Sequence, residues 1–93
     1  MIQTLDFLFE VWRNDELKKE LLDNIDDIKK EKIIIGRHIL TFLKEEKKVI
    51  VTHADSDHPQ IIPAKLPTEK LKSMINNETD AWDLSDVIYL YDF

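Results

Sequence analysis

The first third of the chain alternates between apolar and polar residues with the period of an α-helix. Residues 4–13 form the first such segment, with apolar positions at i, i+3, i+4 and i+7. These positions are Leu5, Leu8, Phe9 and Trp12, and two more apolar residues, Phe7 and Val11, widen the stripe. We therefore expect a largely buried helix here.

A second helix is predicted directly after the first and should end near Glu31. Asn14 or Asp15 can cap it, because a short polar side chain accepts hydrogen bonds from the N–H groups of the first helical turn. Its inward face consists of Leu17, Leu21, Ile25 and Ile28. We expect the two helices of residues 4–31 to pack onto a small sheet.

Residues 33–43 fit two interpretations. Helical spacing would place Ile35, Ile39, Phe42 and Leu43 on one face. Alternatively, residues 38–43 pair with residues 49–53 as a β-hairpin whose tip is the charged segment 44–48. We favour the hairpin, over about residues 37–53, because Gly36 would weaken a helix and residues 49–52 are rich in β-branched side chains.

The second half of the chain adds a helix between two strands. Residues 60–62 fit a short edge strand bounded by two prolines, and Pro67 and Thr68 open a third helix over about 68–77. The inward side chains of that helix are Leu71, Met74 and Ile75. The nearly continuous apolar run in residues 86–92 predicts a strand covered on both faces. This order of elements predicts one α+β domain, residues 1–93, with a small antiparallel sheet.

Composition and charge exclude several function classes. The 93 residues contain no cysteine, so disulfides and thiol catalysis are excluded, and no apolar run approaches the ~18 residues of a membrane span. We expect a cytoplasmic protein. The net charge of −6 disfavours direct binding to nucleic acid or to an anionic membrane. Acidic residues dilute the two basic clusters, at residues 29–32 and 44–48. Heavy use of Ile and Lys suggests an AT-rich genome, either a low-GC bacterium or one of its phages.

A polar loop after the predicted hairpin carries four candidate metal ligands, His53, Asp55, Asp57 and His58. Residues 52–58 resemble the H-x-H-x-D-H loop of the metallo-β-lactamase superfamily. The resemblance implies that His53, Asp57 and His58 are metal ligands, with Asp55 where that family has a histidine. The Gly-rich helix start of the family does not follow, and no histidine follows His58. We favour an ordinary polar turn and keep a divalent-metal site as the alternative.

The sequence offers little support for an enzyme. Gly36 is the only glycine, so no Gly-rich phosphate loop exists, and no serine lies in a nucleophile-elbow context. Carboxylate pairs are inevitable in so acidic a chain, and nothing singles one out. His38, alone in an apolar segment, is expected to be a half-buried residue with one hydrogen-bond partner.

The acidic end of the chain is the strongest functional signal. Residues 78–93 contain five acidic residues and no Lys or Arg, so they account for −5 of the net charge of −6. We expect Asp80, Trp82, Asp83 and Asp86 to form part of a partner-binding face, in which charge speeds encounter and the indole supplies the anchor. In the competing interpretation, the acids only keep this end of the domain solvated.

These observations favour a non-catalytic interaction protein that binds a basic surface of a partner protein. It would be a small regulator or inhibitor, by analogy with phage- or mobile-element-encoded proteins of this size and charge. The alternative is a metal-binding protein that uses the loop from His53 to His58, for which metal-dependent hydrolase activity is not favoured.

Overall fold

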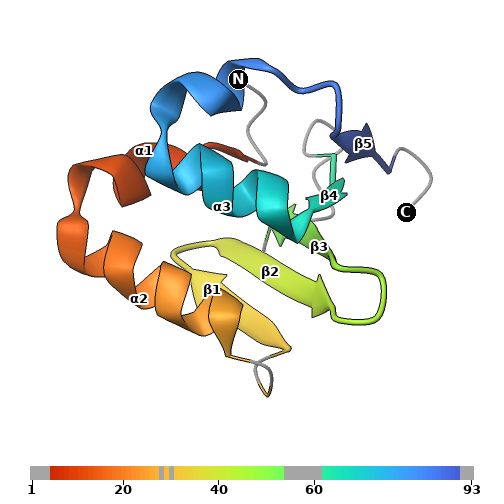
Figure 1. Cartoon of the computed structure of the whole chain (residues 1–93), viewed down its shortest axis with the longest axis horizontal. Coiled ribbons are helices and arrows are strands. Elements are labelled where there is room, and N and C mark those ends of the chain that lie inside the picture. Colours follow the sequence, from red (N-terminus) through yellow and green to blue (C-terminus); the bar gives the residue numbers. More distant parts are fainter. Residues whose placement is uncertain (1–4, 28, 30, 54–61, 91–93) are drawn as a thin grey trace.

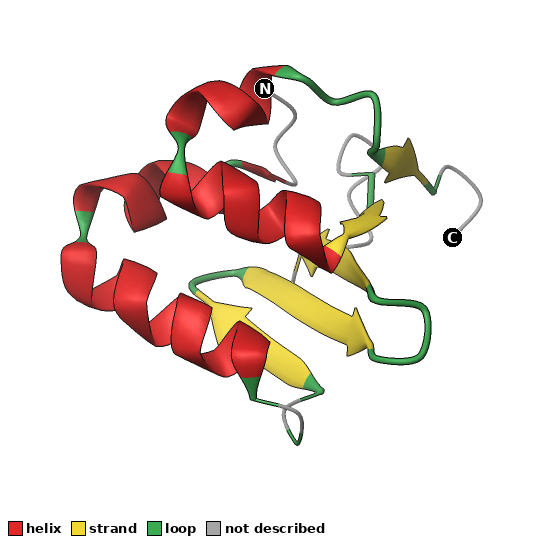
Figure 2. Ribbon diagram, in the orientation of Figure 1, coloured by secondary structure: helices red, strands yellow, loops and turns green. Residues whose placement is uncertain are grey.

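The computed structural model describes residues 5–27, 29, 31–53 and 62–90, which form helices packed on an antiparallel sheet (Figures 1 and 2). The helices are α1 (Phe7–Arg13), α2 (Asp15–Asp26), α3 (Thr68–Asn76) and the 3-10 helix η2 (Glu78–Trp82). The strands are β1 (Lys32–Ile35), β2 (His38–Leu43), β3 (Lys48–His53), β4 (Ala64–Pro67) and β5 (Ile88–Tyr89). The predicted α+β class is confirmed.

Helix α1 buries most of the apolar stripe predicted for it, with one exception. Phe7, Leu8 and Val11 are buried, whereas Phe9 is 42% exposed and was wrongly predicted to face inward. Phe9 lies about 100° round the helix from Leu8, which turns it away from the core. Its ring packs edge-on against the half-buried Trp12, with 5.5 Å between ring centroids. The helix also begins at Phe7, later than predicted.

Helix α2 begins where the sequence predicted and ends earlier. The Asn14 side chain accepts hydrogen bonds from the backbone N–H groups of Glu16 and Leu17, at 3.1 and 3.2 Å, which confirms the cap. The helix ends at Asp26 because Asp27 is extended and its carboxylate accepts the backbone N–H of Lys29 at 2.9 Å. Such a local bond competes with helix continuation. Leu21 and Ile25 are buried as predicted, and residue 28 lies outside the described residues.

The predicted hairpin is confirmed, although its second strand begins at Lys48, one residue earlier than predicted. Strands β2 and β3 pair from His38 with His53 to Leu43 with Lys48. The structure adds β1, which pairs with β2 through a two-residue turn at Gly36 and Arg37. Gly36 has a φ of +57°, a backbone conformation that a tight hairpin turn requires and that glycine adopts freely. Gly36 therefore separates strands β1 and β2, which agrees with the strand interpretation of residues 33–43 rather than the helical one.

The last two strands differ from their predicted positions. The fourth strand is Ala64–Pro67, in which alternate residues are buried, and Ile62 lies outside any strand. Residues 60 and 61 lie outside the described residues. Strand β5 spans Ile88–Tyr89, so the predicted strand over residues 86–92 was too long at residues 86, 87 and 90, and residues 91 and 92 lie outside the described residues. It was also wrong in its burial, because β5 pairs only with the short β4 at the sheet edge and leaves Ile88 54% exposed.

All three α-helices lie on one face of the sheet, and the core fills the space between the two layers (Figure 2). Helix α3 packs against α1, α2, β3 and β4. Its buried residues are those predicted, Leu71, Met74 and Ile75. The Trp12 indole Nε1–H donates to the Met74 carbonyl oxygen at 2.9 Å and so ties α1 to α3.

Candidate functional site

The acidic segment follows α3 directly, and its local structure fixes where each side chain points. The backbone N–H of Asn77 donates to the Ser73 carbonyl, and the Asn77 side chain accepts the Thr79 N–H at 3.2 Å. These bonds end α3 and begin η2. Ala81 is buried at 3% exposure, and its neighbour Trp82 is 79% exposed. The small Ala81 side chain thus holds η2 on the core and turns the indole outward.

The four residues predicted to bind a partner divide into two groups. Asp80 is half-buried and accepts a hydrogen bond from the Ser73 hydroxyl, so it joins η2 to α3. Trp82, Asp83 and Asp86 are exposed; Trp82 is the last residue of η2, and Asp83 and Asp86 lie between η2 and β5. We call these three residues the Trp82 surface.

Two apolar residues hold the Trp82 surface from beneath. Leu84 is half-buried against the core and Val87 is buried, so this segment is attached to the domain at both positions. The hydroxyl and the backbone N–H of Ser85 donate to the Asp83 carboxylate, the latter at 3.1 Å. These bonds lower the pKa of Asp83 below the ordinary 3.8, because they stabilise the ionised form.

The proposed metal loop is described only at its first residue. His53 ends β3, and its ring packs edge-on against that of His38, with 4.9 Å between centroids. His38 is half-buried and also contacts the ring of Phe7, at 5.5 Å. Asp55, Asp57 and His58 lie outside the described residues. Within the described ranges, no three His, Asp or Glu side chains are placed to hold a metal, so the metal site stays a prediction.

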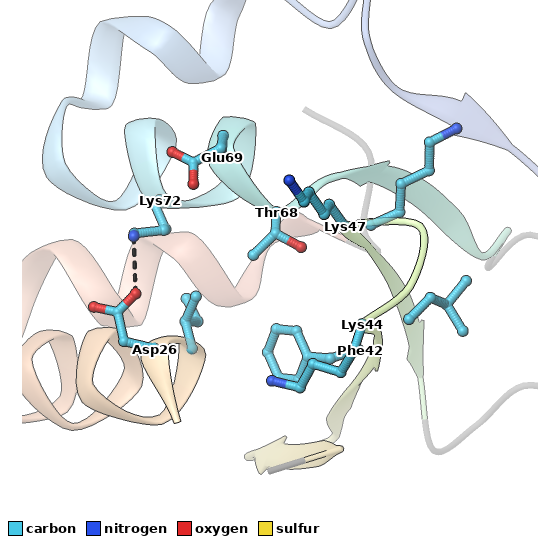
Figure 3. Close-up of a pocket in the computed structure, with 10 residues that line it drawn as sticks. Asp26, Phe42, Lys44, Lys47, Thr68, Glu69 and Lys72 are labelled. Carbon is cyan, nitrogen blue, oxygen red and sulfur yellow. Dashed lines mark hydrogen bonds and ion pairs between the residues drawn. The ribbon is translucent and has the colours of Figure 1, made fainter. Parts of the chain in front are cut away.

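A pocket of about 240 Å³, which sequence analysis did not identify, lies between α2, α3 and the β2–β3 turn (Figure 3). It is lined by Ile25, Asp26, Phe42, Leu43, Lys44, Lys47, Lys48, Thr68, Glu69 and Lys72. In sequence, Glu45 and Glu46 dilute the lysines of the turn. In the structure neither glutamate lines the pocket, and Glu46 pairs instead with Lys65 at 3.2 Å. The turn therefore separates basic from acidic residues that are adjacent along the chain.

Two of the pocket lysines have described partners. The Lys72 ammonium pairs with the Asp26 carboxylate at 2.8 Å, and this bond raises the pKa of Lys72. The Lys44 ammonium donates to the Asp27 carbonyl oxygen at 2.9 Å and lies 5.2 Å from the centre of the Phe42 ring. The α2 end and the β2–β3 turn are thereby joined across the pocket.

Comparison with protein-family models, with curated proteins and with solved structures finds no match for this chain. In the part of the chain that the structure describes, none of the helices has the length and apolar character needed to cross a bilayer. The Trp82 surface and the pocket are therefore the features of the described structure that bear on function.

Proposed function

We propose that this chain is a non-catalytic interaction protein that docks the Trp82 surface onto a basic surface of a partner protein. The observation that carries the proposal is the 79% exposure of Trp82. An indole left in water forgoes the free energy of burial, which a partner could supply. Trp is also among the residue types that most often dominate binding energy.

The charge around Trp82 favours a basic partner. Asp83 and Asp86 are exposed and follow Trp82 by one and four positions in the chain, and residues 78–93 contain five acids and no base. Such a field speeds the encounter with a cationic surface and repels nucleic acid and anionic lipid. The bonds from Ser85 lower the pKa of Asp83, so its charge persists into acidic solution.

The proposed class is a small regulator or inhibitor that acts in the cytoplasm. Its support is the size of 93 residues, the net charge of −6 and the absence of cysteine from the sequence. The resemblance in size and charge to phage-encoded inhibitors is an analogy that suggests a viral or mobile-element origin.

The test compares matched variants against a partner captured from the source organism. Asp83→Lys with Asp86→Lys reverses two charges on the Trp82 surface, and Glu20→Lys with Asp23→Lys makes the same change on the exposed side of α2. Only the first pair should slow association and flatten its salt dependence in surface plasmon resonance. We leave Asp80 intact because its bond to Ser73 is structural.

Trp82→Ala tests the anchor separately. It should raise the dissociation rate about 30-fold, the equivalent of a hot spot of about 2 kcal/mol, while the association rate changes little. Circular dichroism should show a folded protein, since the indole is exposed. Equal effects of the two double-lysine variants, or an unchanged dissociation rate in Trp82→Ala, would refute the proposal.

A further inference from the structure

The pocket between α2, α3 and the β2–β3 turn is cationic although the chain as a whole is acidic. Four of its ten lining residues are lysines and two are carboxylates, Asp26 and Glu69, which leaves a formal charge of +2. The whole chain carries −6. Like charges gathered in one concave space repel each other, and a bound anion relieves that repulsion.

Three of the four pocket lysines form no ion pair with the described residues. Lys72 alone among the pocket lysines forms an ion pair there, with Asp26 at 2.8 Å. Lys44 donates to a backbone carbonyl, which is a neutral acceptor. Lys47 and Lys48 form no ion pair within the described part of the chain. The pocket therefore offers ammonium groups that a ligand can neutralise.

The backbone that carries Lys47 is tied to α3. The Lys47 carbonyl oxygen accepts the backbone N–H of Thr68 at 3.0 Å, which ties the β2–β3 turn to α3. Lys47 itself has a φ of +56°, in the left-handed region that favours glycine. Figure 3 shows Lys72 and Lys47 on either side of Thr68, with Lys44 beside Phe42 below them.

We propose that this pocket binds a small phosphate-bearing molecule. A phosphate monoester carries about −1.5 to −2 charges at neutral pH, which matches the formal charge of +2, and lysine is a common phosphate ligand. Phe42, Ile25 and Leu43 supply an apolar surface for the rest of the ligand. The volume of about 240 Å³ lies just below the ~300 Å³ at which drug-sized sites begin, so the ligand is small.

This site is independent of the Trp82 surface. The pocket is lined by Thr68, Glu69 and Lys72, in the first five residues of α3. The 3-10 helix η2 and the Trp82 surface follow the opposite end of α3, after Asn76. The pocket proposal can therefore fail while the partner proposal stands, and the reverse.

The experiment is an NMR titration of the full chain with phenyl phosphate, with benzoate and phenol as ligands of lower and zero charge. Phenyl phosphate should shift the backbone amides of residues 42–48 and 68–72 in a saturable way, at least tenfold more tightly than benzoate, and phenol should produce no saturable shift. Added salt should weaken the binding.

Two variants decide whether the lysines carry the binding. Lys44→Gln with Lys47→Gln removes two pocket charges, and Lys70→Gln removes a charge from α3 outside the pocket. The double variant should weaken binding at least tenfold, and Lys70→Gln should change it less than twofold. The proposal would be overturned by amide shifts scattered over the whole surface or by benzoate binding as tightly as phenyl phosphate. It would also be overturned if the two variants lost affinity equally. The unchanged amide spectrum of the remaining domain verifies that each variant is folded.

Discussion

The hydrogen bond between Trp12 and Met74 predicts a large difference between two chemically identical substitutions. Helix α3 ends at Asn76, so the Met74 carbonyl is one of the final carbonyls that lack a partner within the helix. The Trp12 indole supplies that partner at 2.9 Å, and Met74 is fully buried. Trp12→Phe removes the donor and leaves a buried acceptor unsatisfied, which costs about 1–3 kcal/mol. For a domain of this size, each 1 kcal/mol lowers Tm by about 4–8 °C.

Trp82→Phe is the matched control, because Trp82 is 79% exposed. We expect it to change stability by less than about 0.5 kcal/mol. Thermal melts followed by circular dichroism measure both variants. Replacement of Trp12 by benzothienylalanine separates the bond from the ring volume, since this side chain keeps the bicyclic shape and lacks the N–H. A Tm for that protein equal to wild type would refute the role of the hydrogen bond.

Two further predictions concern the core and the acidic segment. Leu21 is only 1% exposed, so Leu21→Ala should lower the free energy of unfolding, measured in urea, by about 2–5 kcal/mol. Leu22→Ala, at a half-buried position, should lower it less. Equal urea midpoints for the two variants would contradict the packing of α2. Ser85→Ala should raise the pKa of Asp83 toward 3.8, as followed by carboxyl ¹³C shifts. Because folding lowers this pKa, the associated stability is present above the unfolded value and is lost as pH falls through the folded one. An unchanged titration midpoint would exclude the Ser85 hydroxyl as a cause.

Sequence patterns correctly predicted those features of the fold that depend on residues close together in the chain. The cap at Asn14, the hairpin from His38 to His53 and the burial of Leu71 depend on residues no more than 15 positions apart. The end of α2 was missed because the bond from Lys29 to Asp27 competes with a helical pattern that continues past it.

The remaining differences depend on residues distant in sequence. Strand β4 is short, follows Pro63 and ends at Pro67, and it is recognisable mainly through its pairing with β3. The exposure of Trp82 follows from the seating of Ala81 on the core. The pocket is formed by α2, the β2–β3 turn and α3, which are distant in sequence. The residues next to Lys44 and Lys47 therefore do not reveal that Glu45 and Glu46 lie outside the pocket.

The strands lie in the sheet in the same order as in the chain, β1-β2-β3-β4-β5, and this order has a consequence for the folding pathway. The most distant described strand partners, Ala64 and Tyr89, are 25 residues apart, whereas Trp12 and Met74 are 62 apart. Closing short loops loses less chain entropy, so we expect the sheet and α3 to assemble before α1 docks. Trp12→Phe would then accelerate unfolding and leave the folding rate nearly unchanged, because its bond forms after the rate-limiting step.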